Sequence, residues 1–165
     1  AYNDLIIDLN DATERYELIG GYHYQGTTER ILQGLGFVPS DFEKMTDTFS
    51  GGWRMRIELA KLLLQDNDIL LLDEPTQSLD AAGAMGVMHL LRGAADDGAA
   101  VGVVVHDLNL AQAFCDHVLV LQNGVVRAKG APRDVFTPSQ LAPIFEVEFD
   151  VMDVGKARYL MPTMS

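Results

Sequence analysis

The spacing of apolar positions divides the chain into a helical first part and a second part in which strands and helices alternate. Apolar side chains recur at helical spacing over residues 5–19, and the glycines at 20 and 21 end that pattern. Further short helices are expected over residues 28–35 and after the capping-box pattern that Ser40 forms with Glu43. Residues 1–50 are therefore predicted to form a small helical unit.

After the first fifty residues, short apolar runs are separated by helical stretches. The apolar runs at residues 69–72 and 101–105 are typical of strands that are buried on both faces of a parallel sheet. A helical pattern lies between the two runs, and Gly98 ends it. A strand, a helix and a second strand in this order predict a right-handed crossover unit.

Turn signals organise the last third of the chain. Asn123-Gly124 lies between two strand-like segments and predicts a hairpin. Thr137-Pro138 is typical of a helix start, and residues 149–161 form a weaker hairpin pattern around Gly155. The whole pattern predicts an α/β fold.

Composition narrows the class of protein. Of 165 residues, 48% are apolar, which is typical of a globular domain. Twenty-four acidic residues against 12 basic ones give a net charge of -12, which argues against wrapping nucleic acid or an anionic membrane surface. The single cysteine, Cys115, excludes an internal disulfide framework and fits a reducing compartment. We find no signal-peptide pattern and no apolar run long enough for a membrane span.

Both predicted parallel strands end in chemically useful side chains. Asp73 and Glu74 follow the first strand, and His106 follows the second. Ligands of open parallel sheets lie at the carboxyl ends of the strands, so these residues are candidates for a hydrated magnesium ion, a general base and a phosphate contact. The alternative is a strand that ends in a solvated acidic turn.

Ser50-Gly51-Gly52 opens the helix that precedes the first strand. Exposed backbone N–H groups and the positive end of a helix dipole form an anion site. The alternative for this triplet is an ordinary N-cap followed by flexible glycines.

Four segments taken together resemble the ATP-binding cassette (ABC) ATPases. In order and spacing they are similar to the family's signature motif, Walker B motif, D-loop and H-switch. These segments are Phe49-Ser50-Gly51-Gly52-Trp53-Arg54-Met55-Arg56, Ile69-Leu70-Leu71-Leu72-Asp73-Glu74-Pro75-Thr76, Ser78-Leu79-Asp80 and His106-Asp107.

The resemblance implies a role for each matching residue. Ser50, Gly51 and Gly52 would hold the γ-phosphate of an ATP bound to a partner cassette, and Asp80 would lie at the interface of a head-to-tail cassette dimer. Asp73 would hold Mg²⁺ through water, Glu74 would be the catalytic base, and His106 would contact the γ-phosphate in its own cassette.

The P-loop of that family, G-x-x-x-x-G-K-[ST], does not occur in the sequence. The chain begins with Ala1 and resembles the later part of a cassette. Because the P-loop supplies most phosphate contacts, we expect little ATP binding by this chain alone. Its partner would be the missing N-terminal half or a cassette that carries a P-loop.

The resemblance also divides between two subfamilies. Up to about Thr76 the chain is similar to the ABC-F proteins, a subfamily that acts on ribosomes. Two segments carry this similarity, Gly34-Leu35-Gly36-Phe37 and residues 49–56. Three later segments are similar to the ATPases of iron-siderophore, haem and cobalamin importers. The three segments are His106-Asp107-Leu108-Asn109-Leu110-Ala111, Gly130-Ala131-Pro132 and Phe136-Thr137-Pro138. The pattern indicates two half-cassettes joined near residues 75–80.

The resemblance therefore predicts a helical signature subdomain at residues 1–50 and a partial RecA-like core at residues 51–165. The first functional hypothesis is an importer ATPase in the cytoplasm, held at the inner membrane by a permease. The alternatives are an ABC-F factor that binds the ribosome and a non-catalytic module, engineered or recombined, that binds a partner protein. No direct contact with nucleic acid is expected.

Overall fold

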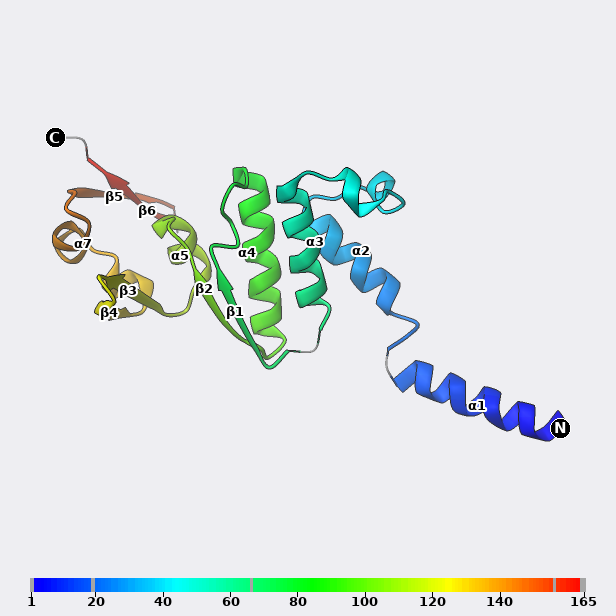
Figure 1. Ribbon diagram of the computed structural model, residues 1–165. Coiled ribbons are helices and arrows are strands. Elements are labelled where there is room, and N and C mark those ends of the chain that lie inside the picture. Colours follow the sequence, from blue (N-terminus) through cyan, green and yellow to red (C-terminus); the bar gives the residue numbers. More distant parts are fainter. Residues whose placement is uncertain (1, 19, 66, 156, 164–165) are drawn as a thin grey trace. The chain divides into compact units, whose positions relative to one another are not determined.

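The computed structural model describes residues 2–18, 20–65, 67–155 and 157–163 and divides into two compact units (Figure 1). The first unit is Ala1–Asn67 and the second is Asp68–Ser165. Every described strand belongs to the second unit. The subdomain boundary expected after residue 50 stays a prediction.

The first unit consists of helices and two short 3₁₀ turns. The predicted first helix is confirmed, and the second begins four residues earlier than expected. The elements are α1 (Tyr2–Leu18), α2 (Tyr24–Gly34), η1 (Pro39–Asp41), η2 (Thr46–Thr48) and α3 (Gly51–Leu63).

An aromatic cluster fixes the loop between α2 and α3. The ring of Phe37 packs edge-on against Trp53 at 4.7 Å and against Phe49 at 5.6 Å. The Arg56 guanidinium lies 4.5 Å from the Trp53 ring and donates a hydrogen bond of 2.8 Å to the Leu35 carbonyl. The start of α3 is therefore anchored to the end of α2 by edge-on aromatic contacts, a cation–π contact and a hydrogen bond.

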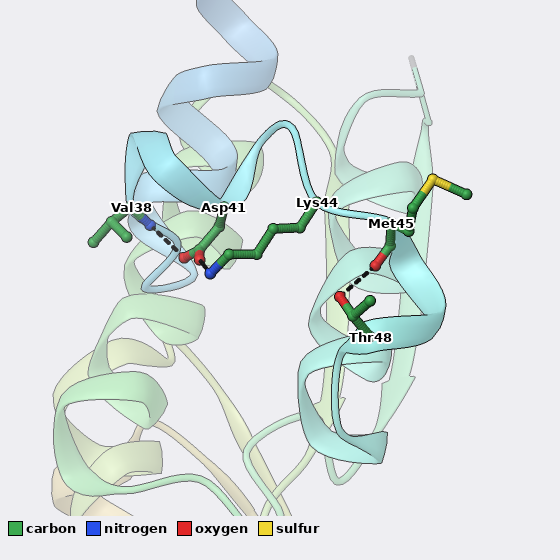
Figure 2. Close-up of polar contacts among 5 residues, drawn as sticks. All are labelled: Val38, Asp41, Lys44, Met45 and Thr48. Carbon is green, nitrogen blue, oxygen red and sulfur yellow. Dashed lines mark hydrogen bonds and ion pairs between the residues drawn. The ribbon is translucent and has the colours of Figure 1, made fainter.

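The prediction of a helix that starts at Ser40 and Glu43 is wrong. The carboxylate of Asp41 instead accepts the backbone N–H of Val38 at 3.0 Å and pairs with Lys44 at 2.6 Å (Figure 2). These two contacts, the Lys44 bond first, hold the pKa of Asp41 below its usual value. The carboxylate closes a single 3₁₀ turn at Pro39–Asp41, which does not continue into an α-helix.

The second unit alternates helices with three separate two-stranded sheets. Its elements are β1 (Ile69–Asp73), α4 (Ala81–Asp96), β2 (Ala100–Val104), α5 (Leu108–Phe114), β3 (Val118–Gln122), β4 (Val125–Gly130), α6 (Pro132–Val135), α7 (Pro138–Phe145), β5 (Phe149–Val154) and β6 (Ala157–Pro162).

The predicted crossover unit is confirmed. Strands β1 and β2 pair in parallel, with Ile69 opposite Ala100 and Asp73 opposite Val104, and α4 lies alongside them (Figure 1). The prediction that both faces of these strands are buried is wrong, however. Leu70 is 7% exposed, whereas its neighbours Ile69 and Leu71 are 74% and 82% exposed. The sheet therefore has one covered face and one open apolar face.

Both predicted antiparallel hairpins are confirmed. Asn123 and Gly124 have positive φ angles, 54° and 75°, as a tight turn between β3 and β4 requires. Strands β5 and β6 pair over Phe149–Val154 and Ala157–Pro162. Between the hairpins lies the main apolar cluster of this unit, whose buried members are Ala111, Val118, Val120, Val135, Phe136, Leu141 and Leu160.

The helices that the structure describes include none with the length and apolarity needed to cross a membrane.

Candidate functional site

Parallel pairing brings three of the predicted site residues to one edge of the β1–β2 sheet. Asp73 is the last residue of β1 and lies opposite Val104, the last residue of β2. The backbone N–H of Glu74 donates to the Val104 carbonyl at 3.0 Å, which continues the pairing by one residue. Since His106 follows two residues later, the carboxyl ends of both strands supply the site, as is usual in parallel sheets.

Glu74 and His106 are in direct contact. The imidazole Nε2 of His106 lies 2.5 Å from the carboxylate Oε1 of Glu74. The Glu74 side chain is 27% exposed, and that of His106 is 80% exposed, so the ring projects from the sheet and has little packing around it. Glu74 also has a positive φ of 48°, which is uncommon outside glycine and is frequent at functional sites.

Asp73 has the chemistry to hold a magnesium ion. Its side chain is exposed at the end of β1, and it has no side-chain hydrogen bond or ion pair among the described residues. The described residues form no cluster of three or more metal-ligating side chains. A single free carboxylate fits Mg²⁺, which keeps several waters and takes the remaining ligands from substrate phosphates.

Asp80 already has a local structural role. Its Oδ1 accepts the backbone N–H of Gly83 at 2.8 Å, which caps the N-terminus of α4. The residue is exposed. The interface role that the resemblance implies for Asp80 stays a prediction.

Ser50, Gly51 and Gly52 lie in the first unit, at the start of α3. Ser50 is the N-cap residue, but its hydroxyl makes no capping hydrogen bond. All three residues are exposed, and a Cβ atom added at either glycine would meet no atom within 4 Å. Packing within this chain therefore does not explain the two glycines, and the helix start is open to an outside group.

The second unit also contains an apolar cavity of about 700 Å³. Strand β2 and strand β3 both line it, and they are not hydrogen-bonded to each other in the described structure. His106 and Cys115 lie on its wall. Burial, and then the nearby Asp116 carboxylate, raise the pKa of the Cys115 thiol. The Cys115 side chain is half-buried on this wall.

Comparison with known proteins relates this combination of elements to the ABC transporter family. Residues 4–77 match the model of the ABC transporter family. A dimeric, post-hydrolysis structure of the ATP-binding cassette MJ0796, bound to ADP and Pi, is 30% identical with a TM-score of 0.54, over 62% of this chain and 44% of that one. The chain shares the fold of the ABC transporter ATPase domains and resembles part of one. The predicted α/β fold is thereby confirmed.

A structure of a metal-chelate type ABC transporter in an inward-facing conformation has a TM-score of 0.66 to this chain. It covers 82% of this chain and 57% of the other, at 23% identity, and so shows the shared ABC ATPase fold alone.

Two curated relatives are hemin import ATP-binding proteins, HmuV. The protein from Nocardia farcinica is 44% identical over 117 residues, and the one from Rhodococcus jostii is 43% identical over 124 residues. These matches cover 70% and 75% of this chain but 41% of each relative. The chain thus spans about two fifths of the length of these relatives.

The sequence pattern missed two residues that support the site. Asp107 caps α5, because its Oδ1 accepts the backbone N–H groups of Asn109 and Leu110 at 2.8 and 3.1 Å. The Asn109 side chain bonds Leu160, which lies 51 residues further along the chain. Asp107 could be found from its position before a helix, whereas no local signal identifies the partner of Asn109.

Proposed function

We propose that the chain is a segment of the ATPase of an ABC importer for haem or a similar iron chelate. On this proposal it hydrolyses ATP only after a P-loop-bearing part completes the domain. The observation that supports the chemistry is the Glu74–His106 contact beside the free carboxylate of Asp73. The similarity to the HmuV proteins supports the importer class.

Each side chain at this edge fits one role in ATP hydrolysis. The Glu74 carboxylate is placed to orient the attacking water and to accept its proton. His106 holds that carboxylate in position and projects far enough into solvent to donate to a phosphate oxygen. Asp73 would hold Mg²⁺ through water, and the ion when bound would neutralise phosphate charge.

Ser50, Gly51 and Gly52 fit a different surface of the assembly. Their open backbone N–H groups at the start of α3 suit a phosphate that a second cassette carries. On this proposal two domains work head to tail, and Asp80 lies at their interface. A membrane permease binds the pair and keeps this protein at the inner face of the membrane.

The open sheet supports the need for a completing segment. Among the described residues, strand β2 is paired on one side only and β3 pairs only with β4, and both strands line the same apolar cavity. A further apolar strand there would bury Leu71 and the walls of the cavity, including Cys115. The sequence lacks the phosphate-binding loop, so such a segment would also have to supply it.

The structure provides less support for the ABC-F alternative. The segments that carry that resemblance supply Phe37, Phe49, Trp53 and Arg56, and these side chains pack on one another. Internal packing therefore accounts for them without a ribosome. A join near residues 75–80 remains a separate proposal, which the sequence upstream of the chain in its gene would test.

Calorimetry with Mg-ATP tests the proposed function first on the chain alone and then on a completed domain. The completed domain would fuse the P-loop-bearing part of the Nocardia farcinica HmuV to this chain. We expect no measurable binding by the chain alone and turnover by the fusion. Glu74→Gln should abolish that turnover and leave nucleotide binding, because the amide cannot accept the proton.

The matched control is Glu148→Gln, an exposed glutamate in the same unit. It should turn over like the unmodified fusion. Turnover by the chain alone would contradict the need for a P-loop, and equal activity of both glutamine variants would contradict the role of Glu74. Growth on haem of a strain that lacks its own hemin import ATPase tests the importer class.

A further inference from the structure

Two amide side chains on α5 bind the backbone of strand β6. Asn109 Nδ2 donates to the Leu160 carbonyl at 3.1 Å, and the Leu160 N–H donates to Asn109 Oδ1 at 2.8 Å. One turn further on, Gln112 Nε2 donates to the Arg158 carbonyl. The backbone N–H and C=O groups of residues 158 and 160 point away from β5, toward the free edge of β6. Helix α5 binds this edge where a further strand would otherwise pair.

Asn109 is the better satisfied of the two amides. Both of its side-chain groups are bonded to the same residue, and Leu160 is only 3% exposed within the apolar cluster. Gln112 Oε1, by contrast, is buried without a hydrogen-bond partner among the described residues. The attachment of α5 to the C-terminal hairpin therefore depends mainly on Asn109.

The attached helix begins beside the candidate site. Asn109 lies three residues after His106, and its backbone N–H is held by the Asp107 carboxylate. The helix has seven residues, too few to be stable in isolation. Because the His106 ring is 80% exposed, the backbone that leads into α5 must set the direction in which it projects.

We propose that Asn109 is a positioning residue that ties α5 to the β5–β6 hairpin and thereby holds His106 in contact with Glu74. The hairpin is then a remote support of the site, 51 residues away in sequence. The consequence for ATP hydrolysis depends on the function proposed above, but the arrangement of the two side chains can be measured without nucleotide.

The test is an NMR measurement on the full 165-residue chain with labelled histidine rings. The chain has four histidines, so each ring signal can be assigned by single substitution. Glu74→Gln shows how far the His106 ring signal shifts when the contact with the carboxylate is lost. Asn109→Leu removes both side-chain hydrogen bonds at similar volume. We expect it to produce most of the shift in the His106 signal that Glu74→Gln produces. The Leu160 amide should exchange with solvent about tenfold faster.

A second variant and a matched control separate positioning from folding. Asn109→Asp keeps the acceptor for the Leu160 N–H but loses the donor, so the His106 signal should move by a smaller amount. Gln140→Leu removes another amide bond to the backbone of this unit, the one to the Asp134 carbonyl, and should leave the His106 signal in place.

The remaining histidines show how far the change spreads. His89 packs edge-on against Phe114 of α5 at 4.9 Å and should report a movement of that helix, whereas His23 lies in the first unit and should not respond. The proposal is overturned if the Leu160 amide exchanges faster in Asn109→Leu and the His106 signal does not move. Failure of the completed domain to hydrolyse ATP would contradict the proposed function and leave this result unaffected.

Discussion

Two regions of the second unit differ sharply in how they bury apolar side chains. In the cluster between the hairpins, Leu141 is 0% exposed, Phe136 is 2% exposed and Leu160 is 3% exposed. In the β1–β2 sheet, Ile69 and Leu71 are 74% and 82% exposed. Both regions are rich in aliphatic residues, so composition does not explain the difference.

The difference lies in what each region has available to cover it. The cluster receives side chains from α5, α6, α7 and the four strands β3 to β6, so this chain alone closes it. The sheet has only two strands and one open face. The cluster therefore needs no other chain, whereas the sheet with the candidate site at its edge is suited to gain a neighbour.

Truncation of one leucine in each region should give the largest difference in stability between the two regions. Leu141→Ala should lower the free energy of unfolding of the second unit by about 3 kcal/mol, because it leaves a cavity in a closed core. Leu71→Ala should change it by less than about 0.5 kcal/mol, because the side chain is already in water.

Amide exchange of β3 in increasing urea would measure both values. The fluorescence of the single tryptophan is unsuitable, because Trp53 lies in the first unit. Similar losses for the two alanine variants would show that the β1–β2 sheet is covered in solution. The contrast between the two regions would then disappear.

Substitution of Asp80 should have a smaller effect, at the junction between the sheet and α4. Asp80→Ala removes the acceptor of the Gly83 N–H and should destabilise the second unit by about 1 kcal/mol. Asp80→Asn keeps an oxygen at the cap and should be nearly neutral. Urea unfolding of the chain alone measures the capping role, without any contribution from a cassette interface.

A loss of activity by a completed Asp80→Asn domain, despite unchanged stability, would support the interface role separately. Equal stability of the alanine variant and the unsubstituted chain would contradict the capping role.

Local signals in the sequence were enough to predict much of the fold. Asn123-Gly124 specified a tight turn, Thr137-Pro138 specified a helix start, and the aliphatic run before Asp73 specified a parallel strand. Each of these depends on interactions within a few residues. The helix expected after Ser40 failed for the same reason, because the nearby carboxylate of Asp41 offered a competing local bond to Val38.

Features that depend on distant partners could not be predicted in this way. Leu71 belongs to a run typical of a buried strand, but its burial depends on neighbours that this chain does not place there. Strand order predicted that Glu74 and His106 share an edge, because parallel strands end together. The bonds from Asn109 to Leu160 depend on how a helix meets a hairpin 51 residues later, for which the sequence has no local pattern.

The smallest effect on stability, and the most direct probe of the open face, is expected from Leu71→Lys. An exposed sheet face with unpaired strand edges favours self-association, so the unsubstituted chain should form concentration-dependent oligomers in sedimentation velocity. A lysine at residue 71 should reduce that association at little cost in stability, since the position is already exposed. Leu18→Lys is the matched control, because Leu18 is 79% exposed on α1 in the first unit. If Leu18→Lys alone abolishes the oligomers, the apolar surface of α1 is the one that associates, and the β1–β2 face needs no partner to remain soluble.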